Sequence, residues 1–225
     1  MDKILLTLAV NLVNKAPHEQ IKSLLLEIIS LKKQDNSLIG NWHPLGFIHA
    51  NLGHIDGIGT IRLHIWLPNK RKTQNPSFPI HDHVFTVNSH ILSGSVTNRI
   101  YQIEEDLINS THKLYTVKYD NNKSILQSLN QKINCQFISE ESFTSGQYYS
   151  VNSNVFHSSE VNKNQFASTL VLTNNYINGE PKVVGELFLN DIYTYERSLC
   201  ESVEFLEIIA SLEQKLKLSK QLFIN

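Results

Sequence analysis

Between residues 41 and 190 the chain consists of short β-type runs separated by Gly, Asn and Pro, and this pattern constrains the fold most. The sequence predicts strands at 60–66, 81–93, 95–103, 112–119, 133–139, 147–151 and 166–173. Many short strands with turn residues between them are typical of an all-β sandwich or barrel rather than of alternating α/β units. A polar segment at 120–134, rich in Asn, Lys, Gln and Ser, is expected to form a long solvated excursion.

One predicted strand, 60–66, alternates cleanly between two kinds of side chain. Because strand side chains alternate between faces, one face carries Ile61, Leu63 and Ile65, while the other carries Arg62, His64 and Trp66. We expect the first face to meet apolar packing and the second to line a polar cavity or to face solvent.

The segments on both sides of this β region have helical periodicity instead. Residues 2–15 predict one helix, and a second after Pro17 has an apolar stripe of Ile21, Leu24, Leu25 and Ile28. After residue 190 a third stripe contains Phe205, Ile209, Leu212 and Leu216. The predicted organisation is one compact domain with an N-terminal helical flank at 1–40, a β-barrel at 41–190 and a C-terminal helix at 191–225.

Composition excludes several classes of partner. The net charge is −1 and no long basic run occurs, which argues against a nucleic-acid or anionic membrane partner. No run of about 18 or more apolar residues predicts a membrane span. The two cysteines, Cys135 and Cys200, cannot form a disulfide framework in a chain of 225 residues, so we expect a reducing, cytoplasmic location.

The stretch at 78–85 contains His81-Asp82-His83, the most distinctive chemical feature of the chain. Two imidazoles one residue apart on a strand point to the same face, so both can bind one divalent metal ion. Other ligands would have to come from elsewhere in the chain.

Two spaced blocks, taken together, resemble the two motifs of the cupin superfamily. The first, Asn75-x5-His81-x-His83-x3-Val87-x6-Gly94, resembles G-x5-H-x-H-x3,4-E-x6-G. The second resembles G-x5-P-x-G-x2-H-x3-N and reads Gly146-x5-Asn152-Ser153-Asn154-x2-His157. The resemblance implies a mainly β fold, the cupin double-stranded β-helix (a jelly-roll barrel), with two N-terminal helices and a C-terminal helix added. It also implies that His81, His83 and His157 are metal ligands.

The chain departs from these motifs at several positions. Asn75 and the run 152–154 replace motif Gly and Pro residues, which is a mild change because Asn tolerates left-handed backbone geometry. Val87 replaces the ligand glutamate and Val161 the final asparagine. His90 is a weaker candidate for the missing ligand, because it lies on the opposite strand face from 81, 83 and 87 unless a bulge intervenes.

Within the cupins, a three-histidine site without the glutamate is similar to that of the thiol dioxygenases, cysteine dioxygenase among them. This resemblance implies iron(II) that binds a thiolate and dioxygen, although imidazoles also suit zinc, nickel and copper. The Ser-His-Tyr set of that group is missing, since Leu170, Val171, Leu172 and Thr173 occupy the corresponding stretch. Its substrate-binding arginine is missing around 47–49. The block 42–47, WHPLGF, resembles a feature of an uncharacterised cupin-like group and implies no function.

The leading hypothesis is a metal-dependent, iron(II) oxygenase or dioxygenase that acts on a small polar molecule, with a thiol or carboxylate as candidate groups. Arg62, His64 and Tyr101 are the candidates to orient the substrate or move a proton. One alternative is a cupin isomerase, lyase or hydrolase that uses the metal as a Lewis acid. Another is a non-enzymatic small-molecule-binding cupin. Pairing through strand edges, common in cupins, implies a homodimer.

Overall fold

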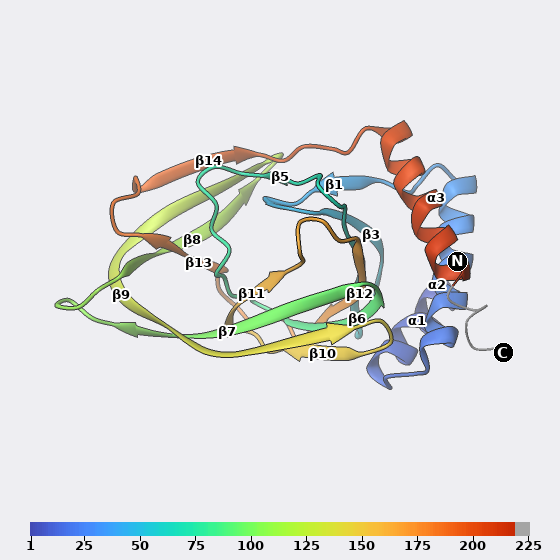
Figure 1. Ribbon diagram of the computed structural model, residues 1–225, viewed down its shortest axis with the longest axis horizontal. Coiled ribbons are helices and arrows are strands. Elements are labelled where there is room, and N and C mark those ends of the chain that lie inside the picture. The colour runs from blue at the N-terminus through green and yellow to red at the C-terminus, as the bar shows by residue number, and fades with distance from the viewer. Residues whose placement is uncertain (219–225) are drawn as a thin grey trace.

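The computed structural model describes residues 1–218 and is mainly β, with two six-stranded sheets and three helices (Figure 1). The helices are α1 (Asp2–Val13), α2 (His18–Gln34) and α3 (Ser202–Leu218). The first sheet has the order β1 (Gly40–Trp42), β3 (Ile48–Ile55), β4 (Gly59–Trp66), β12 (Ala167–Asn174), β6 (Thr86–Ser93) and β10 (Tyr148–Val151). Residues 219–225, which the predicted C-terminal helical segment includes, lie outside the described residues.

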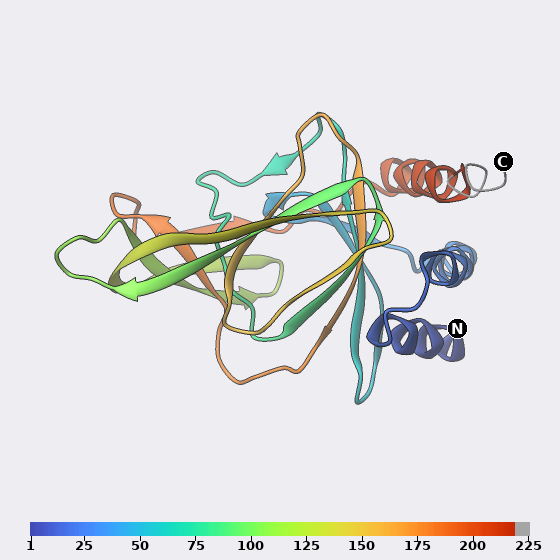
Figure 2. The same cartoon turned by 60° about the horizontal axis from the view of Figure 1, so that its bottom comes forward.

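The second sheet lies on the side of the first that faces away from the helices (Figure 2). Its order is β11 (Phe156–Glu160), β7 (Ser95–Glu105), β9 (Lys123–Thr144), β8 (His112–Asp120) and β13 (Lys182–Glu186), and β14 (Ile192–Glu196) also pairs with β9. Strands β2 (Leu45–Gly46) and β5 (Lys72–Thr73) form a separate pair. The prediction of a mainly β chain with helices at both ends is therefore confirmed.

The three helices cover the outer face of the first sheet. The predicted apolar face of β4 points toward them, with Ile61, Leu63 and Ile65 almost fully buried in one cluster with helix residues such as Leu25 and Phe205. The predicted helical stripes are buried in the same cluster. The opposite face of β4, with Arg62, His64 and Trp66, points between the sheets, where Trp66 joins a different apolar cluster.

Two strands pass from one sheet to the other at glycines. Strand β6 continues into β7 at Gly94 (φ +78°), and β9 continues toward β10 through Gly146 (φ +90°). A Cβ at position 94 would overlap the carbonyl oxygen of Phe166, so this corner requires glycine for space as well as for its left-handed backbone. Because β6 pairs with β10 and β7 with β9, the two-stranded ladder continues around the corner.

The other edge of the sandwich is bridged by the segment after β14. Strand β14 pairs with β9 of the second sheet, and the chain then runs beside β1 of the first sheet. Here the Trp42 N–H donates to the Ser198 carbonyl at 2.9 Å, and the Cys200 N–H donates to the Gly40 carbonyl at 2.9 Å. The two sheets still keep separate hydrogen-bonded ladders, and no closed barrel forms among residues 1–218. The architecture is that of an open β-sandwich or jelly roll, which is consistent with the predicted jelly roll, except that the barrel does not close within these residues.

The predicted solvated excursion at 120–134 is also wrong. This segment forms the β8–β9 turn and the first half of β9, which pairs with β8 on one side and β14 on the other. Its polar composition reflects the exposed positions of that strand, while Ser124, Leu126 and Ile133 are buried. The C-terminal helix begins at Ser202, because 192–196 form β14.

Within residues 1–218, no helix has the length and apolar character needed to cross a membrane.

Candidate metal centre

His81, His83 and His157 come together between the two sheets. Their ring centroids are 4.8 Å apart for His81–His83, 4.6 Å for His81–His157 and 5.1 Å for His83–His157. One ligand atom from each lies within 4.8 Å of those of the other two. No Asp, Glu or Cys joins a metal-binding cluster with them among residues 1–218.

The backbone holds the first and third histidines in direct register. The His81 N–H donates to the His157 carbonyl at 3.0 Å, and the His157 N–H returns a bond to the His81 carbonyl at 2.9 Å. The Asn154 N–H donates to the His83 carbonyl at 2.9 Å, from a residue with a φ of +60°. His157 lies in β11, but His81 and His83 precede β6 and lie outside any regular strand, contrary to the predicted strand at 81–93.

Hydrogen bonds fix how two of the imidazoles present their nitrogens. Nδ1 of His81 lies 2.9 Å from the Pro79 carbonyl oxygen, and Nδ1 of His157 lies 3.1 Å from that of Val155. A carbonyl only accepts, so each Nδ1 carries the proton and each Nε2 has a free lone pair. Metal-binding histidines are commonly oriented in this way by a backbone carbonyl.

Burial keeps all three rings neutral at pH 7. Desolvation is the main cause that lowers the pKa of His81, brings that of His157 from 6.5 to about 3, and places that of His83 well below its usual range. The neighbouring imidazoles lower the pKa of His83 and His157 further. Neutral imidazole is the form that binds a metal ion.

Asp82, between the two histidines, anchors their segment and points away from them. Its carboxylate accepts a hydrogen bond from the Lys182 N–H at 2.5 Å, and its own N–H donates to the Lys182 carbonyl at 2.9 Å. Burial raises the pKa of this carboxyl, and the bond from Lys182 opposes the shift. The Asp82 side chain therefore fixes the His81–His83 segment to β13.

The two positions weighed for a fourth ligand have other surroundings. Val87 is buried with Val151 and Val171, so an apolar group occupies the position of the motif glutamate. His90 faces the helix layer, where its Nε2 lies 2.9 Å from His18 Nδ1. His90 thus lies apart from the cluster, as expected, although His81 and His83 precede β6 and the parity of one regular strand is not the reason.

A second group of histidines lies on the inner faces of β3 and β4 and in the loop before β2. His49 pairs directly with His64 across the two strands, with ring centroids 6.5 Å apart, and His43 lies 5.9 Å from His49. Burial is the main cause that lowers the pKa of all three, to about 4 for His49. The sequence analysis did not identify His43 and His49 as candidate site residues. His49 could have been found as the residue opposite His64 in two neighbouring antiparallel strands.

Arg62 is connected to the first group through an aromatic ring. Its guanidinium carbon lies 5.3 Å from the centroid of the Phe85 ring, and Phe85 stacks on His83 at 4.8 Å with an angle of 15° between the rings. The predicted candidates Arg62 and His64 therefore both face the space between the sheets.

Tyr101 lies elsewhere. Its hydroxyl is 3.4 Å from Ser158 Oγ, and its ring contacts Phe137. Ser158 follows His157 in β11, so its side chain is on the opposite face of the strand. The structure does not bring Tyr101 to the three histidines.

Residues 170–173, which occupy the positions of the Ser-His-Tyr set of the thiol dioxygenases, lie in β12. Its inner face carries Thr169, Val171 and Thr173, which pair with His64, Arg62 and Thr60 of β4. None of these β12 side chains titrates near neutral pH, so proton transfer at this site would depend on residues of other strands.

Comparison of the chain with known protein families, with curated proteins and with solved structures found no match. The class of protein that fold and site define is thus a β-sandwich with a buried three-histidine cluster that could hold a metal ion.

Proposed function

We propose that this chain is a cupin-type, metal-dependent oxygenase in which His81, His83 and His157 hold a divalent metal ion, iron(II) in the working enzyme. The observation that carries the proposal is the convergence of three neutral imidazoles, two of them with Nε2 left free by a backbone hydrogen bond. The passage of β6–β7 and β9–β10 from sheet to sheet supports the cupin assignment.

The residues present fit such a metal ion. The three ligand atoms lie within 4.8 Å of one another, so all three imidazoles could serve one ion. Three neutral ligands and no carboxylate leave the charge of the ion uncompensated, which favours an anionic substrate or a thiolate as a further ligand.

Iron(II), when bound, supplies the dioxygen and one-electron chemistry that protein side chains lack. The protein residues would bind and orient the substrate. Arg62 is suited to hold a carboxylate through two parallel hydrogen bonds, and its position over Phe85 sets that carboxylate beside His83. Phe85 and Val87 present apolar surface on this side of the cluster, which limits the access of water.

Proton transfer is proposed for the second histidine group. His64 and His43 are neutral at pH 7. His64 has one nitrogen that can donate and one that can accept, whereas Nδ1 of His43 already accepts the Leu45 N–H and its Nε2 can only donate. Tyr101 has no part in this proposal because of its position behind β11.

The test is dioxygen uptake by metal-free protein reloaded anaerobically with iron(II) or with zinc. The substrate panel contains small thiols, with and without a carboxylate, and small carboxylates without a thiol. Uptake that needs both iron(II) and one substrate class would support the oxygenase. Arg62→Gln should then raise KM for the carboxylate-bearing members and leave KM unchanged for the others, while Arg99→Gln, on the outer side of β7, serves as control.

The alternatives give different results in the same experiment. Turnover with zinc and without dioxygen would favour the Lewis-acid isomerase, lyase or hydrolase, since three histidines also suit catalytic zinc. Metal-dependent binding of a panel member without turnover would favour a binding protein. The cytoplasmic location and the homodimer remain part of the proposal and are tested by fractionation and by light scattering.

A further inference from the structure

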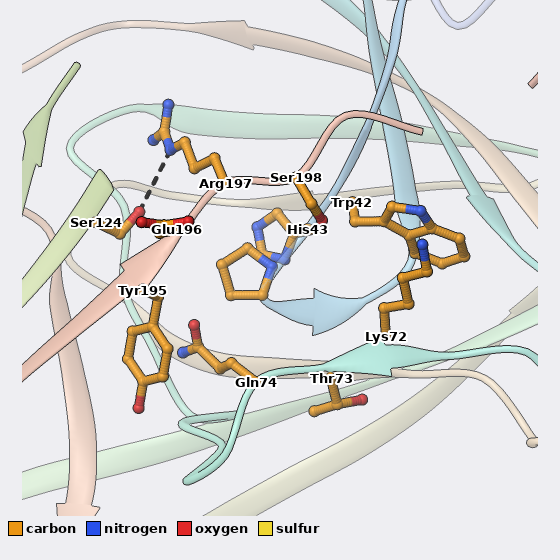
Figure 3. Close-up of a pocket in the computed structure, with 11 residues that line it drawn as sticks. Trp42, His43, Lys72, Thr73, Gln74, Ser124, Tyr195, Glu196, Arg197 and Ser198 are labelled. Atoms are coloured by element: carbon orange, nitrogen blue, oxygen red, sulfur yellow. Dashed lines mark hydrogen bonds between the residues drawn. The ribbon is translucent and has the colours of Figure 1, made fainter. Parts of the chain in front are cut away.

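A cavity of about 290 Å³ opens where the segment after β14 crosses β1, β2 and β5. Figure 3 shows His43 near its centre, Trp42 and Lys72 on one side, and Arg197, Ser124 and Tyr195 on the other. The block 42–47, which implied no function in the sequence, supplies three of the lining residues. The volume is at the lower limit for pockets that bind small molecules.

Two cations line this cavity without a carboxylate partner. Lys72 Nζ lies 4.8 Å from the centroid of the Trp42 ring, and the Arg197 guanidinium carbon lies 4.3 Å from that of Tyr119. Arg197 also donates a hydrogen bond to Ser124 Oγ at 3.3 Å. Neither cation forms an ion pair within residues 1–218, in contrast to Lys70, which lies 2.6 Å from Glu204.

One acidic residue, Glu196, also lines the cavity, so the formal charge of the lining is positive by one. Glu196 is exposed, at the end of β14, and forms no ion pair in the described part of the chain. Both cationic residues are exposed, and each lies over an aromatic ring, which lowers the entropy lost when an anion binds.

Two polar atoms of the lining are buried without a hydrogen-bond partner. They are Nε1 of Trp42, whose residue is 4% exposed, and Oε1 of Gln74. A buried donor or acceptor that stays unpaired is destabilising. Both atoms belong to lining residues but have almost no accessible surface, so a polar ligand would pair with them only after a small movement of these side chains. The indole N–H is a donor, as an anion requires, and the amide of Gln74 can present either its oxygen or its NH₂ group.

His43 connects the cavity to the second group of histidines. It lines the cavity, and its ring centroid lies 5.9 Å from that of His49. Its Nδ1 accepts the Leu45 N–H at 3.1 Å, so Nε2 carries the proton. Stacking on Phe47 at 4.2 Å fixes the ring. His43 is thus a neutral, oriented hydrogen-bond donor in the cavity wall.

We propose that this cavity binds a small molecule through an oxyanion group, carboxylate or phosphate, held by Lys72 and Arg197 with Trp42 and His43 as neutral donors. Binding of the anion needs no metal ion.

The test measures binding to metal-free protein by tryptophan fluorescence and calorimetry, at constant ionic strength. The probes are glutarate and inorganic phosphate, with tetramethylammonium as the cationic control. We expect saturable binding of one of the two anions, which identifies the oxyanion, and none of the cation. Lys72→Gln and Arg197→Gln should each weaken binding by about tenfold, as loss of a charge-assisted contact does. Lys118→Gln and Arg99→Gln, cations on other surfaces, should have no effect.

Three outcomes would overturn the proposal. The first is the absence of saturable binding of both anions. The second is an affinity in Lys72→Gln and Arg197→Gln that equals that of the original protein. The third is loss of anion binding in Arg62→Gln alone, which would place the anion at the histidine cluster. Since the measurement uses neither metal nor turnover, it can succeed where the oxygenase proposal fails. A His83→Ala variant should retain anion binding for the same reason.

Discussion

The contact between His18 and the buried His90 predicts a specific dependence of stability on pH. His90 is fully buried between β6 and α2, and its ring lies 4.2 Å from that of Tyr148. Burial, with a smaller contribution from His18, lowers the pKa of His90 from 6.5 to about 3. The folded protein therefore binds fewer protons than the unfolded chain between these two pH values.

The sign and the size follow from linkage. A pKa that is lower in the folded state leaves stability unchanged above about pH 6.5 and reduces it as pH falls toward 3. At pH 5 the unfolded chain gains about 2 kcal/mol from protonation of this one histidine, while the folded state gains almost nothing. That is a large part of a typical stability of 5–15 kcal/mol.

The assay is urea denaturation of metal-free protein at pH 7.5 and pH 5, followed by circular dichroism. His90→Gln removes the titrating group but keeps a donor toward His18, so the loss of stability between the two pH values should be about 2 kcal/mol smaller than in the original protein. His54→Gln, at a side chain that is 57% exposed, is the matched control and should show no such change.

An identical pH dependence in His90→Gln and the original protein would refute this reasoning. If the variant does not fold, the titration of the His90 imidazole followed by NMR gives the same information. A midpoint near 6.5 would contradict the effect of burial.

Three further predictions concern the packing and the support of the site. Gly94→Ala should lower the free energy of unfolding, measured by urea denaturation, by at least about 2 kcal/mol, because of the positive φ and the clash at the sheet corner. Gly57→Ala, at a positive φ in open space, should lower it by about 1 kcal/mol. Leu63→Ala, in the helix–sheet core, should lower the free energy of unfolding by about 2–5 kcal/mol. Leu107→Ala, at a residue that is 75% exposed, should lower it by less than about 0.5 kcal/mol. Asp82→Ala should lower metal affinity by about tenfold to a hundredfold, because it removes the hydrogen bond that fixes the His81–His83 segment to β13. Competition with a chelator measures this affinity. An unchanged affinity would show that the anchor to β13 is dispensable.

The sequence predicted those parts of the fold that depend on local periodicity. The alternation of β4 and the helical stripes placed Leu63 and Phe205 correctly, because burial on one face leaves a regular pattern. Strand β9 was missed in its first half, since a strand with one solvent-facing side can be as polar as a loop. Its identity depends on pairing with β8 and β14, which lie at other positions in the chain.

The candidate metal centre could likewise be predicted only where a pattern in the sequence encodes it. Motif spacing brought His157 to the His81–His83 pair, although the assumption of one regular strand through His81 and Val87 was wrong. Residues that act through tertiary contact left weaker signals. His43 lies in a loop, and its proximity to His49, with ring centroids 5.9 Å apart, depends on how that loop folds back on β3, which no local pattern encodes.

The central claim is that His81, His83 and His157 bind one divalent metal ion, and metal stoichiometry tests it most directly. Metal-free protein is titrated with iron(II) under anaerobic conditions, and with zinc, and the bound metal is determined by elemental analysis. The account predicts one ion per chain and a rise in Tm on binding. It also predicts loss of both in His83→Ala and His157→Ala, with His54→Ala unchanged. Full metal occupancy in His157→Ala, or no binding by the original protein, would contradict it.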